Sequence, residues 1–246
     1  MRLTGVFILS CLSLAAEADT VTVAVASNFR TTAELVAAAF RAETGHEVRI
    51  SVASTGKLHA QVVHGAPFDV LLAADTESPR LLEEAGLGVV GSRFTYAIGI
   101  LVLWSAADGA EDCRNDLQTP GNFRLAIANP ATAPYGRAAE EFLQAAGLWE
   151  SLAPRLVYGE NVGQTMHFAA SGNARYALVA KSQAIDPALP LTTCLWQVPG
   201  DAHAPLDQQA VLLQRAADNE AARSFLHFLQ SATARDTIRR SGYGVP

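Results

Sequence analysis

The 246-residue sequence lacks several features that mark common classes of protein. It has no excess of positive charge, since 18 Lys and Arg stand against 24 Asp and Glu, and no basic stretch has interleaved aromatic residues. Because nucleic-acid affinity comes mainly from Lys and Arg that neutralise phosphates, no nucleic-acid partner is expected. The six histidines form no pair at zinc-ligand spacing with supporting Cys or Asp, so we expect no metal bound directly by side chains.

Motifs of common hydrolases and nucleotide-binding proteins are absent or incomplete. There is no Gly-x-Ser-x-Gly element. The turn Ser54-Thr55-Gly56-Lys57 fits Ser-x-x-Lys, in which Ser54 would be a nucleophile beside the base Lys57, but the companion Ser-Asp-Asn and Lys-Thr-Gly elements are missing. The same turn resembles the end of a P-loop, but Ser51 stands where Gly is required and Leu58 replaces the magnesium-binding hydroxyl. A secreted serine hydrolase using Ser54 and Lys57 stays as an alternative.

The N-terminal segment 1–18 has one positive charge, then an apolar run, then an Ala-x-Ala end. This order is typical of a secretory signal peptide cut after Ala18, and the run is too short to span a bilayer as a helix. We therefore expect a periplasmic protein. Lipid attachment at Cys11 is an alternative, although Leu9 and Ser10 before it fit the lipid-attachment pattern poorly.

Two cysteines, Cys113 and Cys194, remain after removal of the signal peptide. Disulfides persist in an exported protein, so we expect these two residues to pair. Two buried free thiols are the alternative.

A short apolar strand that ends in small polar residues where a helix begins recurs four times. The four segments are Val23–Asn28, Ile50–Gly56, Ala126–Gly136 and Leu156–Val162. A helix N-terminus carries unpaired N–H groups and about half a positive charge, so four such ends that converge would hold one small oxyanion. Taken singly, Ser27, Thr55 and Asn161 could equally be helix N-caps.

Strands alternate with helices along the chain, which indicates mostly parallel sheets covered on both faces. The candidate strands are 21–26, 48–53, 69–73, 98–104, 124–128, 175–180 and 209–213. The first two junctions precede residue 60 and the other two lie between 129 and 162, while the C-terminal strand and helices would complete the N-terminal sheet. The predicted fold is therefore α/β with two lobes, formed by 19–96 with 206–246 and by 97–205. All four junctions would face the cleft between them.

Six segments in the two halves of the chain carry a family resemblance: Ala24–Phe29, Ala53–Gln61, Gly65–Asp75, Asn129–Pro130, Pro134–Gly136 and Gly159–Val162. In these segments the chain resembles the periplasmic molybdate-binding proteins of ABC transporters. The resemblance runs from about residue 20 to the C-terminus. It implies a two-lobed, class II type solute-binding protein that closes on a tetrahedral oxyanion and delivers it to a membrane permease, as a monomer and without a cofactor.

The resemblance also implies the ligand-binding residues. They are Ser27 with Asn28 beside it, Thr55, Tyr135 and the backbone N–H of Val162. Two departures from better-known members stand out: Thr55 replaces Ser, and Ala180 replaces a Tyr donor. Tyr135 stands where those members have a small residue, so its phenol would replace the one lost at Ala180.

The ligand class follows from these donors. Molybdate and tungstate are dianions without a proton at neutral pH, so their site needs donors only. Phosphate keeps a proton and needs an acceptor, for which Glu160 alone among the four turns could serve, and the resemblance leaves Glu160 outside the site. A smaller anion such as sulfate would leave buried donors unmatched at about 1–3 kcal/mol each. We therefore expect a binding protein for molybdate or tungstate, not an enzyme, with sulfate, phosphate or an organic anion as alternative ligands.

Overall fold

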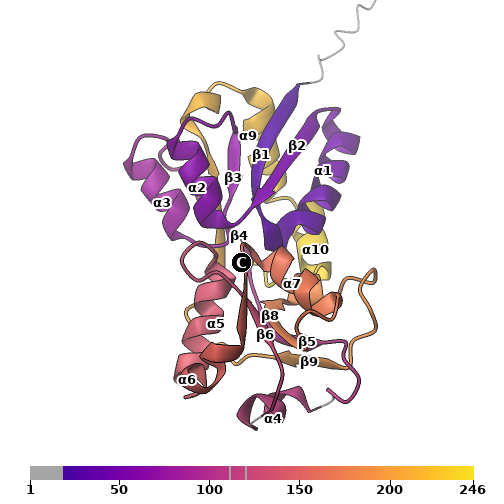
Figure 1. Cartoon of the computed structure of the whole chain (residues 1–246). Coiled ribbons are helices and arrows are strands. Elements are labelled where there is room, and N and C mark those ends of the chain that lie inside the picture. Colours follow the sequence, from indigo (N-terminus) through magenta and orange to yellow (C-terminus); the bar gives the residue numbers. More distant parts are fainter. Residues whose placement is uncertain (1–18, 111, 120) are drawn as a thin grey trace, which may run out of the picture.

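The computed structural model describes residues 19–110, 112–119 and 121–246, so the predicted signal peptide and Cys11 lie outside the described residues. The chain forms two lobes, each built on a five-stranded sheet (Figure 1). The strands are β1 Thr20–Ala26, β2 Glu47–Ala53, β3 Val70–Leu72, β4 Phe94–Ile98, β5 Leu101–Ser105, β6 Leu125–Ala128, β7 Leu156–Gly159, β8 Tyr176–Ala180, β9 Cys194–Gln197 and β10 Asp207–Leu212. This arrangement confirms the predicted two-lobed α/β fold.

The strand order is β2-β1-β3-β10-β4 in lobe 1 and β7-β6-β8-β5-β9 in lobe 2. In lobe 1, β10 runs antiparallel to both of its neighbours, and in lobe 2 β5 does the same. The other described strands of each sheet share one direction. Each sheet is therefore mostly parallel, and its one reversed strand follows a crossing from the other lobe.

Helices cover both faces of the sheets (Figure 1). They are α1 Arg30–Thr44, α2 Thr55–Val63, α3 Glu77–Glu84, α4 Cys113–Gln118, α5 Pro134–Ala145, α6 Trp149–Leu152, α7 Val162–Ala170, α8 Lys181–Ala184, α9 Glu220–Phe228 and α10 Ala232–Arg240, with 3-10 turns η1 Ser27–Phe29, η2 Ala153–Arg155 and η3 Gln214–Ala216. In the described part of the chain, no helix combines the length and apolarity needed to cross a membrane.

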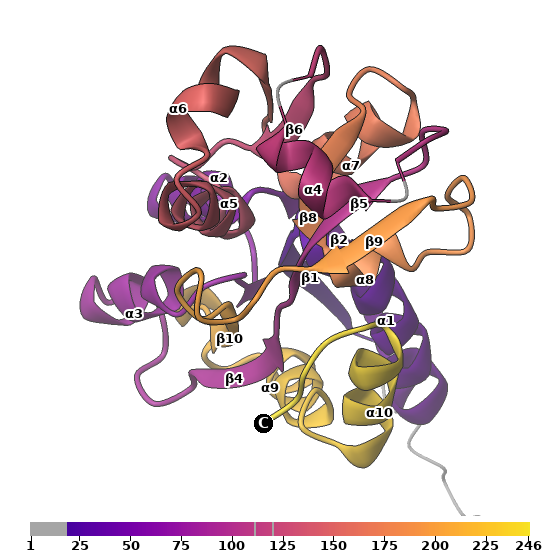
Figure 2. The same cartoon turned by 90° about the horizontal axis from the view of Figure 1, so that it is seen from below.

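The core of lobe 1 lies on both faces of β1, whose side chains alternate between them. Val21, Val23 and Val25 pack against α1, α9 and α10, whereas Ala24 packs on the opposite face with Leu58 of α2. Figure 2 shows α2 and α3 on one side of the molecule and α1 and α10 on the other. Because both faces are covered, the strand is a nearly continuous apolar run.

The described residues of lobe 2 form a core cluster in which Trp104 of β5 and Tyr176 of β8 are fully buried. The structure joins Cys113 at the start of α4 to Cys194 at the start of β9 by a disulfide, with 6.1 Å between their Cα atoms. The link holds α4 on the sheet edge.

The first crossing between the lobes lies at Gly99 and Ile100, between β4 and β5. The predicted boundary after residue 96 falls inside β4, because Ala97 and Ile98 still pair with β10. The predicted strand 98–104 is likewise wrong at its start, since Ile98 ends one strand and Leu101 begins another. Strands β4 and β9 were not among the predicted strands. The second crossing occupies 198–206, which contains the predicted boundary after residue 205.

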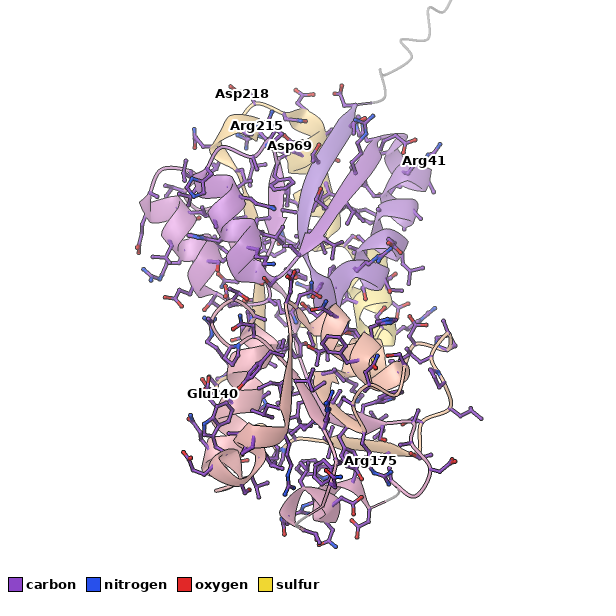
Figure 3. All side chains as sticks on the ribbon, viewed as in Figure 1. Arg41, Asp69, Glu140, Arg175, Arg215 and Asp218 are labelled. Atoms are coloured by element: carbon purple, nitrogen blue, oxygen red, sulfur yellow. A yellow bond between two sulfur atoms is a disulfide. The ribbon has the colours of Figure 1, made fainter. Side chains whose placement is uncertain are left out.

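An ion pair at the end of lobe 1 remote from lobe 2 joins Arg215 and Asp69 (Figure 3). Arg215 Nη1 lies 2.9 Å from Asp69 Oδ1, and Asp69 Oδ2 accepts a 2.7 Å hydrogen bond from the N–H of Thr22. These bonds fix the ends of β1 and β3 opposite the interlobe cleft.

A candidate anion site between the lobes

A small cavity lies where the four strand-to-helix junctions meet. Its lining residues come from both lobes: Ala26, Ser27, Asn28, Ser54, Thr55, Ala74, Ala133, Pro134, Tyr135 and Val162. All five residues that the sequence analysis assigned to the ligand are therefore brought to one place. The cavity measures ≈ 10 Å³, which is about the space that one water molecule needs.

The N-terminus of α2 contributes two adjacent hydroxyls. Thr55 is 1% exposed, and its Oγ1 accepts a 3.0 Å hydrogen bond from the N–H of Ala74, which leaves its own proton to donate. Ser54 precedes the helix but makes no side-chain capping bond. Its Oγ is buried and has no hydrogen-bond partner within the described part of the chain. A buried unpaired hydroxyl is costly, so its presence at a cavity indicates a donor kept for a ligand.

The N-terminus of α5 contributes Tyr135. Pro134 takes the first helical position, where its fixed φ suits the helix and its missing N–H costs nothing. Tyr135 follows and is 1% exposed. Gly136 allows the helix to start against the end of β6, because a Cβ at that position would collide with the carbonyl of Ala128. The turn therefore places the Tyr135 side chain at the cavity.

The N-terminus of α7 contributes Val162, its first residue, whose N–H has no partner inside the helix. Asn161 caps this helix, since its side chain accepts a 3.1 Å hydrogen bond from the N–H of Gln164. For Asn161, the capping interpretation therefore applies.

The turn after β1 contributes Ser27 and Asn28, which are buried. The amide of Asn28 points into a polar network rather than to a ligand. Its Nδ2 donates to Gln208 Oε1 at 2.9 Å and to the hydroxyl of Tyr243 at 3.1 Å. Both amide protons of Asn28 are thus used, so its contribution to an anion site is limited to its backbone N–H.

Polar contacts between the lobes surround the cavity. Lys57 Nζ lies 2.8 Å from Glu160 Oε2, and this ion pair lowers the pKa of the Glu160 carboxyl. The N–H of Gly56 donates to the carbonyl of Thr132 at 2.9 Å. Because Lys57 is engaged with Glu160 and Ser54 Oγ has no partner, the two residues form no nucleophile–base pair.

The cavity has donors but no charge among the described residues that line it. The carboxylate of Asp75, which follows the lining residue Ala74, accepts from the N–H of Ser78 at 2.9 Å and pairs with Arg137 at 3.2 Å. Burial raises the pKa of Tyr135 well above its usual range, and the nearby Tyr243 adds to this effect. The phenol is therefore a neutral donor at neutral pH. Within the described ranges, no group of three or more His, Cys, Asp or Glu side chains could hold a metal ion.

Comparison with known proteins gives concordant results. The family described as bacterial extracellular solute-binding protein matches residues 21–244. The chain is 43% identical to the molybdate-binding protein ModA of Azotobacter vinelandii, over 98% of this chain and 95% of that protein. It is 41% identical to the protein of the same name from Rhodobacter capsulatus, over 98% and 94% of the two chains. The solved structure of the Azotobacter vinelandii periplasmic molybdate-binding protein superposes with a TM-score of 0.88 at 39% identity, covering 92% of this chain and 99% of that one.

Proposed function

The chain belongs to the family of bacterial extracellular solute-binding proteins, and we propose that it captures molybdate in the periplasm and delivers it to the permease of an ABC transporter. The observation that carries this proposal is the convergence of four strand-to-helix junctions, from two lobes, on one cavity that lacks charged lining residues in the described chain. Two relatives at 41–43% identity that are named molybdate-binding proteins support the choice of anion.

We assign the ligand contacts to hydrogen-bond donors only. These are the hydroxyls of Ser27, Ser54, Thr55 and Tyr135 and the backbone N–H groups of Asn28 and Val162. Ser54 is an addition to the ligand residues that the resemblance implied. Its hydroxyl is buried without a hydrogen-bond partner in the described chain, which supports its assignment as a ligand donor. Helix N-termini favour the negative charge through their backbone N–H groups and dipoles.

Selectivity follows from the fixed geometry of the donors. Molybdate and tungstate both present four oxygens and no proton, so the same donors serve both, and we include tungstate as a ligand. Monohydrogen phosphate carries a proton that needs an acceptor, and no carboxylate lines the described cavity. Sulfate is smaller and leaves donors unmatched, at about 1–3 kcal/mol for each buried donor.

Binding couples to a hinge motion at the two crossings. The cavity lies between the lobes and takes its lining residues from both. Lobe 1 supplies Thr55 and lobe 2 supplies Tyr135, and both can donate to one anion only when the lobes are close. The ligand therefore stabilises the closed conformation.

The remaining parts of the proposal concern the context of the protein. We propose that it is exported by its N-terminal segment, acts as a monomer, needs no cofactor and catalyses no reaction. The absence of a Ser54–Lys57 hydrogen bond among the described contacts argues against the serine hydrolase alternative.

The test is a thermal melt of the purified protein with molybdate, tungstate, sulfate or phosphate added separately. An anion at about 100 times its dissociation constant adds roughly 2.7 kcal/mol to the free energy of unfolding, which raises the melting temperature by about 5–10 °C. We expect this rise with molybdate and tungstate only. A rise with sulfate or phosphate of the same size, or with none of the four, would refute the proposed specificity.

A further inference from the structure

The phenol of Tyr135, which lines the cavity, also contacts a buried side chain of the other lobe. Its oxygen accepts a 3.2 Å hydrogen bond from Nε2 of Gln208, which is fully buried on β10. Because Gln208 donates in this bond, the phenol keeps its own proton to donate, and Tyr135 also lines the cavity.

The direction of the Gln208 amide is set by a chain of hydrogen bonds that begins at a backbone carbonyl. The Tyr243 hydroxyl donates its single proton to the carbonyl oxygen of Asn28 at 2.7 Å. The Asn28 side chain must therefore turn its NH₂ group toward Tyr243, at 3.1 Å. The same NH₂ group faces Gln208 at 2.9 Å, so Gln208 presents Oε1 to Asn28 and NH₂ to Tyr135. The chain begins at a backbone acceptor, the carbonyl of Asn28, and this end favours the polarity in which Gln208 donates to Tyr135.

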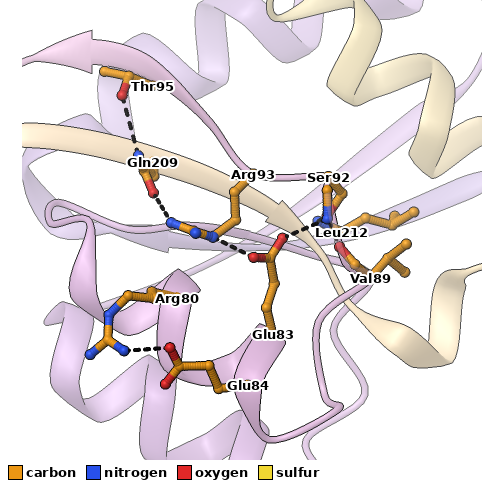
Figure 4. Close-up of polar contacts among 10 residues, drawn as sticks. Arg80, Glu83, Glu84, Val89, Ser92, Arg93, Thr95, Gln209 and Leu212 are labelled. Carbon is orange, nitrogen blue, oxygen red and sulfur yellow. Dashed lines mark hydrogen bonds and ion pairs between the residues drawn. The ribbon is translucent and has the colours of Figure 1, made fainter.

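The backbone around Gln208 is shaped for this contact. The ladder between β10 and β4 shifts register between Gln208 and Gln209, and such bulges re-aim side chains beside binding sites. Gln209 is held separately, because its Oε1 accepts from Arg93 Nη1 at 2.9 Å, and Arg93 also pairs with Glu83 (Figure 4). At Gly99, a Cβ would collide with the Tyr135 hydroxyl and lie 2.8 Å from Gln208 Nε2. Glycine at the crossing therefore leaves room for the bond between the two side chains.

We propose that Gln208 is a positioning residue that makes Tyr135 an obligatory donor, so that the site rejects oxyanions that still carry a proton. This inference rests on the proposed function and names the origin of its selectivity. A phenol free to rotate could accept a proton from monohydrogen phosphate. When Gln208 donates to the Tyr135 oxygen, the phenol turns its own proton toward the cavity, and the proton of monohydrogen phosphate then faces another donor. Since Gln208 and Tyr135 belong to different lobes, the restriction applies when the lobes are closed.

The experiment is a double-mutant cycle of Gln208→Met and Tyr135→Phe, with affinities for molybdate and phosphate measured by calorimetry. Methionine keeps the length of the side chain without the donor. We expect Gln208→Met to weaken molybdate binding about five- to tenfold, and to lower the ratio of the phosphate to the molybdate dissociation constant by at least as much. In the Tyr135→Phe background the same substitution should change neither quantity by more than about twofold.

Two further variants separate positioning from folding. Gly99→Ala blocks the same contact by steric overlap and should reproduce the altered selectivity. Tyr96→Phe is the matched control: the Tyr96 hydroxyl lies 3.1 Å from the carbonyl oxygen of Ala73 and 3.2 Å from Gln208 Oε1, whereas Asn28 Nδ2 donates to Gln208 Oε1 at 2.9 Å without it. This control should leave the selectivity ratio within about twofold of the wild type.

The outcomes are distinct from those that test the proposed function. The affinities in the cycle are measured with the anions that the wild-type protein binds. A wrong ligand assignment is therefore detected in the wild-type titrations, before any variant is compared. An equal effect of Gln208→Met in the Tyr135 and Tyr135→Phe backgrounds would overturn the inference. So would a lower melting temperature with an unchanged selectivity ratio, because that is the behaviour of a merely structural residue.

Discussion

Replacing Ser54 by alanine is expected to have opposite effects on the free protein and on its complex. The Ser54 hydroxyl is buried, lines the cavity and has no hydrogen-bond partner in the described chain. An unsatisfied buried hydroxyl destabilises the unligated fold by about 1–3 kcal/mol. Ser54 precedes α2 but makes no capping hydrogen bond, so alanine loses no cap there. We therefore expect Ser54→Ala to raise the free energy of unfolding of the unligated protein.

The magnitudes follow from the same contact. If about 1 kcal/mol of the penalty is relieved, the melting temperature rises by about 2–4 °C for a chain of this length. In the complex, a hydrogen bond to a charged group contributes about 1.5–3 kcal/mol. Its loss weakens molybdate binding by about 10- to 150-fold.

The assay combines thermal melts of the unligated protein with calorimetric titration of molybdate. Ser105→Ala is the matched control, since Ser105 is also fully buried but its hydroxyl donates to the Arg175 carbonyl at 2.7 Å and accepts from Ala107 at 3.0 Å. The control should lower the melting temperature and leave the affinity unchanged. If Ser54→Ala behaves like Ser105→Ala, or leaves the molybdate dissociation constant within twofold, Ser54 does not bind the ligand.

Other predictions concern the lobe contacts, pH and the cysteines. Glu160→Gln should weaken molybdate binding by less than about fivefold, because its ion pair with Lys57 is exposed, and the loss should vanish at about 1 M salt; a larger, salt-independent loss in titrations would contradict this. Since burial raises the pKa of Tyr135 above 10.0, the unfolded chain loses this proton first, so the free energy of unfolding should be level below about pH 9 and fall above about pH 10 in denaturant titrations; a fall that starts near neutral pH would show that the phenol is not shielded. The protein without residues 1–18 should show no free thiol before reduction, and reduction of Cys113–Cys194 should lower the free energy of unfolding by about 2–4 kcal/mol with unchanged affinity; two free thiols under denaturant would refute the pairing.

The convergence of the junctions could be predicted because it depends on local patterns. Apolar strands followed by small polar residues and a helix start identify the carboxyl ends of parallel strands, and these ends lie at one edge of each sheet. Thr55, Tyr135 and Val162 lie in segments that this rule selects, and the family resemblance assigned them to the ligand. The rule does not distinguish the adjacent hydroxyls of Ser54 and Thr55, so it gave Ser54 no role as a donor. That role is indicated only by the structure, in which Ser54 Oγ is buried without a hydrogen-bond partner in the described chain.

The long-range contacts could not be predicted from local patterns. The sequence predicts Asn28 as a ligand donor, but its side-chain amide donates hydrogen bonds to Gln208 and Tyr243, which lie 180 and 215 residues further along the chain. The first crossing was placed too early for the same reason. The end of β4 is fixed by pairing with β10, more than a hundred residues later, and no turn signal precedes Gly99.

The most direct measurement is a crystal structure of the purified protein grown with molybdate, with the molybdenum located from its anomalous scattering. We predict one strong peak between the lobes, with ligand oxygens in hydrogen-bond range of the Ser54, Thr55 and Tyr135 hydroxyls and the Val162 N–H. A peak at another place, or no ordered molybdenum in a protein that binds the anion in solution, would contradict the assignment of the interlobe cavity as the binding site.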